Sequence, residues 1–277
     1  MRRTYWESRT CLVLALAVLS TTANAAILVQ GSEGQVYLVS TSTAVATLFA
    51  SYPDVPGSDA FSPNGLGYNG NVFNTSFVNS ASNLTLYRNG VALVQPLATT
   101  SQPSGTAVGI AAGDVSGNTY YYIDTDFDLY SVSNINGATH SNVKIMDEMT
   151  GATGLFGDLA ISGGSMVVSY GTNSLQQFDL NGNLLNTITN ETRRYLGLAF
   201  DGGVLYGVVD TGSTNDLYRL VITGTSVVSY LVGTIKLNGS SDLTLTDAAS
   251  VPLPAAAWLL LSGLVGFGFV ARRRSAA

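Results

Sequence analysis

Three aspartates at alternate positions are the first residues of this 277-residue sequence that could do chemistry. On a strand, Asp124, Asp126 and Asp128 would share one face, and carboxylates so arranged could bind Ca²⁺. An EF-hand is excluded, because its sixth position would be Leu129 instead of glycine and its twelfth Ile135 instead of glutamate. Two similar segments further along the chain have polar loops at this place, so we interpret the aspartates as part of a solvated loop.

Histidine and cysteine offer little further chemistry. The single histidine, His140, lies beside the Asn136-Gly137 turn, where an imidazole is solvated and not held between a nucleophile and a carboxylate. Zinc sites built on several His or Cys ligands are excluded by count, since the single cysteine is Cys11. Four tyrosines could stack on sugar rings or, as we favour, alternate between core and surface: Tyr120, Tyr121, Tyr122 and Tyr195.

Three other polar residues, Asn64, Asp158 and Asp242, stand at the starts of short apolar segments. If these segments are the innermost strands of a radial fold, the side chains could line a central channel and bind a metal there. Asp and Asn also cap strand entries by binding free backbone amides, and we prefer that interpretation. We predict no catalytic residue and no cofactor, and these three residues are the candidates if a metal binds.

The elements that would position these residues are short strands joined by tight turns. No stretch of ten or more residues in the body keeps a helical apolar period, so the body is predicted to be all-β. Asn-Gly and Asp-Gly pairs, which favour hairpin turns, punctuate the apolar alternations. They are Asn64-Gly65, Asn69-Gly70, Asn89-Gly90, Asn136-Gly137, Asn181-Gly182, Asp201-Gly202 and Asn238-Gly239.

A longer repeat organises these strands. Segments 118–145, 165–189 and 203–235 each have the order strand, polar loop, strand, turn, strand, and 65–94 is a weaker copy. A short apolar segment rich in small residues precedes each of the three. Anchor residues recur at spacings of 44, 49, 39 and 45 residues: Leu66, Ile110, Leu159, Leu198 and Leu243. A four-stranded unit of this length is typical of a β-propeller blade.

The two ends of the body complement each other. Segment 242–248 repeats a first strand with nothing after it, while the segment from Ala26 supplies three strands that lack a first. Joined, they complete a fifth blade and close the ring, which removes open sheet edges. We predict five blades, or six if the loop 51–63 contains further strands. A two-sheet sandwich is the alternative, but it does not require the ends to complement each other.

A leader is predicted at residues 1–25. Arginines precede an apolar run of about nine residues, and Ala23-Asn24-Ala25 matches the A-x-A site of signal peptidase. Nine residues are too few to cross a bilayer. The body, 26–250, then has six basic and seventeen acidic residues, a formal charge of −11, and no cysteine. This acidity argues against a nucleic-acid partner, and the missing thiol excludes disulfides.

The C-terminal tail, 251–277, is built for a membrane. Residues 255–271 carry no charge, which predicts a helix just long enough to span a bilayer, and Arg272, Arg273 and Arg274 would hold its inner end on the cytoplasmic side. Two prolines, Pro252 and Pro254, keep the preceding peptide extended and accessible to a protease. Only Ala249 and Ser250 separate the predicted closing strand from this motif. The uncut body is therefore expected to sit almost on the membrane.

The order of motif, helix and basic cluster resembles a PEP-CTERM sorting signal. The motif residues match its V-P-L-P-A variant: Val251, Pro252, Leu253, Pro254 and Ala255. Leu253 stands where the commoner pattern has glutamate. The resemblance covers 27 residues and implies processing by exosortase, a membrane-embedded enzyme similar to cysteine transpeptidases, in Gram-negative bacteria that commonly produce extracellular polysaccharide.

The sequence as a whole predicts an exported, non-enzymatic propeller. Signal peptidase and exosortase would process it, and the inner membrane would hold it transiently, with the body outside, before it reaches the cell surface or extracellular matrix. Extracellular polysaccharide is a possible partner. Two other functions remain open: a surface hydrolase or lactonase with a metal in the channel, and a carbohydrate-binding module. An ordinary C-terminal anchor that is never removed is the alternative interpretation of the tail.

Overall fold

The protein was analysed as a computed structural model, which describes residues 25–31, 34–52, 64–78, 83–94, 97, 110–149, 156–170, 174–189 and 193–251. They belong to one compact unit, Ala25–Pro252. Every regular element in these ranges is a β-strand, and no helix in them could cross a membrane. Of the residues at the predicted leader cleavage site, Ala23 lies outside the described residues and Ala25 is the first of them. The predicted helix, 255–271, and the motif beyond Val251 lie wholly outside them.

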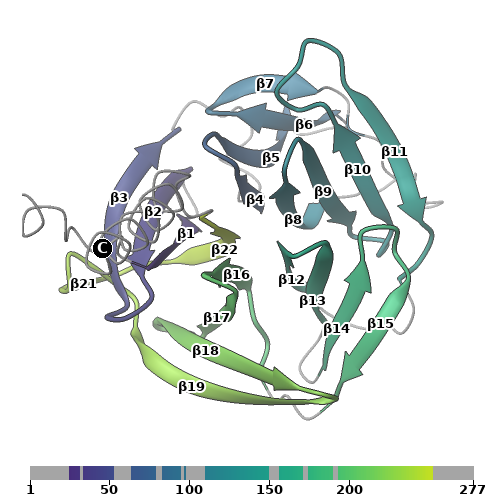
Figure 1. Cartoon of the computed structure of the whole chain (residues 1–277). Helices are drawn as coiled ribbons and strands as arrows, with labels where there is room; N and C mark the ends of the chain where they lie inside the picture. Colours follow the sequence, from purple (N-terminus) through teal and green to yellow (C-terminus); the bar gives the residue numbers. More distant parts are fainter. Residues whose placement is uncertain are drawn as a thin grey trace, which may run out of the picture. The chain divides into compact units, whose positions relative to one another are not determined.

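Four antiparallel sheets of four strands follow one another along the chain (Figure 1). Blade 1 contains β4 (Asn64–Tyr68), β5 (Val72–Val78), β6 (Asn83–Arg88) and β7 (Val91–Val94). Blade 2 contains β8 (Ile110–Ser116), β9 (Thr119–Asp124), β10 (Leu129–Ser133) and β11 (Ser141–Met146). Blade 3 contains β12 (Phe156–Ser162), β13 (Ser165–Tyr170), β14 (Ser174–Asp179) and β15 (Leu184–Ile188). Blade 4 contains β16 (Gly197–Asp201), β17 (Val204–Asp210), β18 (Asn215–Thr223) and β19 (Ser226–Thr234).

Blade 5 is assembled from both ends of the unit. Its innermost strand is β22 (Leu245–Ser250), which pairs antiparallel with β1 (Ala26–Gly31) in a register that places Ile27 opposite Ser250. Two further strands complete the blade, β2 (Gln35–Ser40) and β3 (Val45–Ser51). A small hairpin, β20 (Lys236–Leu237) and β21 (Ser241–Asp242), extends the outer edge, with β20 parallel to β3. The predicted closure by a C-terminal strand is confirmed.

The five innermost strands form a closed ring. Each of β22, β4, β8, β12 and β16 contacts the innermost strand of the blade before it and of the blade after it (Figure 1). The backbone N–H of Leu66 in β4 donates to Asp247 in β22, and that of Phe200 in β16 donates to the Ser250 hydroxyl at the other side. The ring has no gap for another blade, so the fold is a five-bladed β-propeller and the six-blade alternative is wrong.

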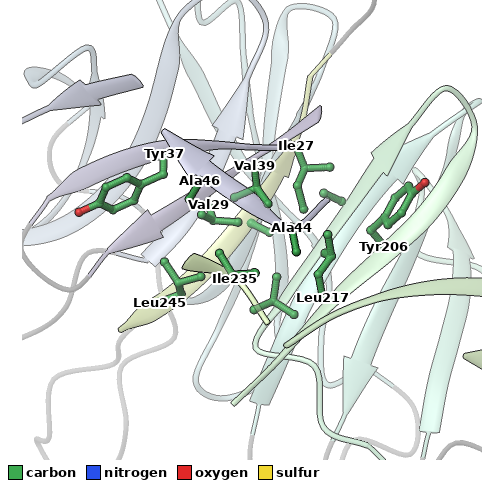
Figure 2. Close-up of a cluster of buried hydrophobic side chains, with 13 residues drawn as sticks. Ile27, Val29, Tyr37, Val39, Ala44, Ala46, Tyr206, Leu217, Ile235 and Leu245 are labelled. Atoms are coloured by element: carbon green, nitrogen blue, oxygen red, sulfur yellow. The ribbon is translucent and has the colours of Figure 1, made fainter. Parts of the chain in front are cut away.

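Apolar side chains fill the spaces between blades. Figure 2 shows the cluster between blades 4 and 5, in which Ile27 and Val39 of blade 5 and Leu217 of blade 4 are fully buried. Full burial of each such side chain stabilises the fold by roughly 1.5–3 kcal/mol. On the other face of β1, Leu28 packs toward Leu66 of blade 1. Because both faces of β1 are buried, its first four residues, 26–29, form a continuous apolar run and not an alternation.

The innermost strands need small residues because they approach one another closely. A Cβ atom added to Gly197 in β16 would lie 2.8 Å from the Cβ of Ala248 in β22. One added to Gly67 in β4 would lie 2.7 Å from Cγ2 of Val115 in β8. Both distances are shorter than carbon atoms tolerate, so a larger residue would force the ring open. The small residues that precede each repeat in the sequence therefore reflect the geometry of the ring.

Candidate functional site: carboxylates at the centre of the propeller

The structure places two of the three candidate channel residues on innermost strands. Asn64 is the first residue of β4, and its amide Nδ2 donates to the backbone oxygens of Ile110 and Ala111 at 3.1 and 2.8 Å. Asp158 lies in β12 and is 1% exposed. Asn64 therefore ties blade 1 to blade 2, and Asp158 lies in the buried centre of the fold.

Asp242 does not lie on an innermost strand, and its predicted position is wrong. It is exposed in β21, at the outer edge of blade 5, where it pairs with Lys236 across the β20–β21 hairpin. The innermost strand begins later, at Leu245, and its buried carboxylate belongs to Asp247. The polar and apolar alternation of residues 242–248 fits either start of the strand. Pairing with β1 selects the later one.

Three buried aspartates, Asp114 in β8, Asp158 in β12 and Asp247 in β22, join neighbouring blades in one common way. Each is 1% exposed and accepts the backbone N–H of the next residue at 2.7 Å. The second carboxylate oxygen accepts a backbone N–H from the next blade. The donors are Ile161 to Asp114 at 2.8 Å, Leu198 to Asp158 at 2.7 Å and Leu66 to Asp247 at 2.6 Å.

Sequence reasoning missed Asp114 and Asp247. Each is embedded in a short apolar segment, as in Gly113-Asp114 and Thr246-Asp247, and Gly157-Asp158 has the same form. An aspartate inside the small-residue segment of a blade was the available signal. A carboxylate there satisfies two buried backbone amides at once, which a main-chain ladder cannot do at the junction of two sheets.

Burial raises the pKa of all three carboxyl groups. Desolvation raises the pKa of Asp158 well above its usual range, and the nearby Asp247 raises it further. Desolvation also raises the pKa of Asp247, to about 7, although hydrogen bonds from Asp158 and from backbone amides oppose the change. The hydrogen bond between the two carboxyl groups also raises the pKa of Asp158 and lowers that of Asp247. The pKa of Asp114 is raised well above its usual range for the same main reason, burial.

A tyrosine occupies the centre beside these carboxylates. Tyr120 of β9 is fully buried, and its hydroxyl donates to the backbone oxygen of Gly65 at 2.6 Å. A Cβ atom on Gly113 or Gly65 would collide with that hydroxyl, and Gly65 also has a φ of +67°. The glycines make room for the tyrosine ring. Its hydroxyl in turn satisfies the carbonyl of Gly65, at the point where the register between β4 and β5 shifts.

Among the described residues, no group of three or more His, Cys, Asp and Glu side chains is arranged to hold a metal ion. Both carboxylate oxygens of each of the three buried aspartates accept backbone N–H groups, one from the same strand and one from the next blade. In this part of the chain, the arrangement is that of a structural tie between blades.

The predicted loop of alternating aspartates is more ordered than a solvated loop. Asp124 is fully buried and accepts the backbone N–H groups of Asp126 and Asp128, both at 3.0 Å. Asp128 is 3% exposed and forms an ion pair with Lys144 at 2.7 Å. Asp126 and Asp128 lie in the loop after β9, but Asp124 is the last residue of that strand, and the interpretation as a solvated loop is wrong for Asp124 and Asp128, which are buried and shape the turn.

The other candidates from the sequence have structural roles. His140 is half-buried beside the Asn136-Gly137 turn, with its Nδ1 3.1 Å from the backbone oxygen of Asn134. The expected alternation of the tyrosines is confirmed, since Tyr120 and Tyr122 are fully buried and Tyr121 is half-buried. Tyr195 is fully buried as well. None of the fully buried rings is available to stack on a sugar.

A groove of about 530 Å³ lies between blades 3 and 4. Val167, Gln177 and Asn186 lie opposite one another on three successive strands of blade 3 and form one wall. Phe200 and Leu205 of blade 4 contribute to the other wall. The amide of Asn186 donates to the backbone oxygen of Gly224 at 2.6 Å and so connects the two blades across the groove.

The fold has distant counterparts among solved structures. A glutaminyl cyclase from Myxococcus xanthus is 14% identical over 68% of this chain and 69% of its own, with a TM-score of 0.39. The computationally designed Ika8 protein is 14% identical over 83% of this chain and 66% of its own, with a TM-score of 0.41. The dihydro-heme d1 dehydrogenase NirN is 11% identical over 74% of this chain and 53% of its own, with a TM-score of 0.42. No family model and no curated protein matches the sequence.

Proposed function

We propose that the protein is exported and delivered to the cell surface or extracellular matrix by an exosortase-type sorting system, and that its propeller acts there as a non-enzymatic structural or binding module. In this account signal peptidase removes residues 1–25. The tail 251–277 holds the protein in the inner membrane until it is cut. Extracellular polysaccharide is the partner class that we propose for the released propeller.

The observation that carries the proposal is where the folded strands begin and end. β1 begins at Ala26, directly after the predicted signal-peptidase site. β22 ends at Ser250, directly before the V-P-L-P-A motif. The register pairs Ile27 with Ser250, and all strands in the described residues lie between the two predicted processing sites. Removal of both terminal segments would leave each blade complete.

The central carboxylates support a structural role for the propeller interior. Both oxygens of Asp158 accept backbone N–H groups, one from its own strand and one from the next blade. A metal would have to compete with those bonds and with the hydrogen bond between Asp158 and Asp247. This arrangement favours a non-enzymatic role over a metal-dependent hydrolase.

Substitution of the two motif prolines tests the sorting step. In the cells that make the protein, we expect the wild type to lose its tail and to leave the membrane fraction. The double variant Pro252→Ala and Pro254→Ala should keep an intact tail and stay in the membrane, because the peptide is no longer held extended for a protease. Immunoblots of membrane, surface and medium fractions measure the distribution.

The matched control is Ser262→Ala, which changes the predicted helix and leaves the motif unchanged. It should be sorted like the wild type. If the wild type and the proline variant both remain in the membrane with intact tails, the tail is an ordinary anchor and the sorting proposal is wrong.

A further inference from the structure

One face of the propeller gathers two turns from each of blades 1 to 4 and one turn from blade 5. In an antiparallel four-stranded sheet, the turn between the first and second strands and the turn between the third and fourth strands lie at the same end. The innermost strands run in one direction around the ring, so these ends lie on one face. Hydrogen bonds connect neighbouring turns, such as Asn69 Nδ2 to Gly117 O at 2.9 Å and Thr41 Oγ1 to Asp201 Oδ2 at 2.8 Å.

These turns contain no Asp, Glu, Lys or Arg, although the body is strongly acidic. We call this surface the neutral face and define it by its turns: residues 41–44, 69–71, 89–90, 117–118, 134–140, 163–164, 181–183, 202–203 and 224–225. Three charged side chains lie at the adjoining strand ends, and each forms hydrogen bonds within the protein. Arg88 donates to Ile135 O, Asp179 accepts from Asn181 and Asn183, and Asp201 is buried against Thr41.

Charged side chains gather at the opposite ends of the strands. The turns and connections there carry Asp126, Asp147, Glu148, Arg193, Arg194 and Asp210 within the described ranges. Asp128 lies in the same loop as Asp126, and Lys144 bridges it to Asp147. Acidic groups therefore predominate on this opposite face, and the charge of the propeller is segregated along its axis.

The chain leaves the propeller at the neutral face. Ser250 is the last residue of the innermost strand β22 and lies next to Phe200, one residue before the end of β16 and its turn at 202–203. After it, the motif 251–254 precedes the apolar segment that begins at residue 255. Four extended residues span at most about 14 Å. A tail inserted in a bilayer would hold the neutral face within about that distance of the headgroups.

Electrostatics favours the same orientation. Negative charges near an anionic bilayer are repelled, and the repulsion decays over a Debye length of about 8 Å at physiological salt. A strand of seven residues, such as β12, is about 23 Å long. With the neutral face toward the bilayer, the acidic face stands more than two Debye lengths away. With the opposite face toward it, the carboxylates would meet the lipid charge directly.

We propose that the neutral face is a membrane-apposed surface, which lies against the lipid headgroups while the tail is attached. This inference rests on the proposed function, because the tail supplies the attachment. The uncharged Asn, Ser, Thr and Gly residues of the face can hydrogen-bond to headgroups without electrostatic repulsion. The acidic face is then directed away from the membrane.

Energy transfer to labelled lipids tests the orientation. Residues 26–277, which contain no cysteine, are reconstituted into phosphatidylcholine vesicles with and without phosphatidylglycerol, each with an acceptor dye on the headgroups. A donor dye is attached through Ala138→Cys on the neutral face or Ser213→Cys on the opposite face, both exposed positions. We expect severalfold higher transfer from residue 138 than from residue 213.

Added charge provides the second arm. Thr43→Glu with Thr225→Glu places two carboxylates at exposed positions of the neutral face. Thr125→Glu with Ser213→Glu is the matched pair on the opposite face. For both pairs, energy transfer is measured from the donor at residue 138. The first pair should lower transfer only on vesicles with phosphatidylglycerol, and the second should leave it unchanged.

Equal transfer from residues 138 and 213, or an equal effect of both charge pairs, overturns the orientation while leaving the tail as an anchor. If the protein does not float with the vesicles at all, the tail does not anchor it. The proposed function then fails, and the orientation fails with it.

Discussion

A chain that ends at Ser250 is expected to fold into a complete propeller, whereas a chain that ends at Thr244 is expected not to fold. The difference is β22, whose loss exposes both the inner edge of β1 and the apolar clusters on either side of blade 5. It also removes the Asp247 tie to Leu66 and the Ser250 tie to Phe200. These losses are comparable to a net stability of about 5–15 kcal/mol, which is typical of a folded domain.

Far-UV circular dichroism and urea titration of residues 26–250 and 26–244 measure this effect. The longer chain should unfold in one cooperative transition, and the shorter one should show none. Addition of a peptide with residues 243–251 to the shorter chain should restore the transition, because the missing strand can pair with β1 in trans. A cooperative transition of unchanged midpoint in the shorter chain would show that β22 does not close the ring.

The stability of the propeller is expected to fall as the pH rises from about 4 to above 7. The folded-state pKa of Asp247 is about 7, against 3.8 for an ordinary aspartate, so the folded protein binds more protons than the unfolded chain over this range. Stability from this group is complete below pH 4 and is lost as the pH rises through 7. Each tenfold difference in the acid dissociation constant between the folded and unfolded states corresponds to roughly 1.4 kcal/mol. The free energy of unfolding is therefore expected to fall by an amount on the order of 4 kcal/mol.

Urea unfolding of residues 26–250 at several pH values between 4 and 8 measures this dependence. Asp247→Asn should be less stable at pH 5, because one of its two backbone donors then faces an amide NH₂ group, but its stability should vary less with pH. Asp179→Asn is the control. The pKa of that exposed carboxylate is lowered by Asn183 and Asn181, so its contribution is lost only below pH 4 and the slope above that should not change. Stability that is constant or rising between pH 5 and 8 would contradict the assignment.

The blade count and the ring closure could be predicted because they depend on local chemistry that repeats. Asn-Gly and Asp-Gly turns favour hairpins wherever they occur, and Leu66, Ile110, Leu159 and Leu198 all lie on innermost strands as the repeat predicts. The fifth anchor, Leu243, lies two residues before β22. Residues 236–242 instead form the hairpin that pairs with the outer edge of blade 5. The alternation of polar and apolar residues does not predict this tertiary pairing.

The central carboxylates could be predicted only in part, because their role depends on which strands meet. The place of Asp114 in the small-residue segment of a blade is the only local signal, and it does not show that the carboxylate accepts an N–H group from Ile161 in the next blade. The local sequence likewise does not show the burial of Asp124 and Asp128, which follows from the turn that they shape. Only the pairing of strands in three dimensions shows that these aspartates, which the sequence offers as metal ligands, bind backbone N–H groups instead.

Mass spectrometry of the protein isolated from the surface or medium of its own cells tests the central claim most directly. The account predicts an N-terminus at Ala26 and a C-terminus within the motif, between Val251 and Ala255, so that the mature protein is the propeller with almost nothing beyond it. A chain that still carries Arg274 at its C-terminal end, recovered from the same fractions, would contradict it.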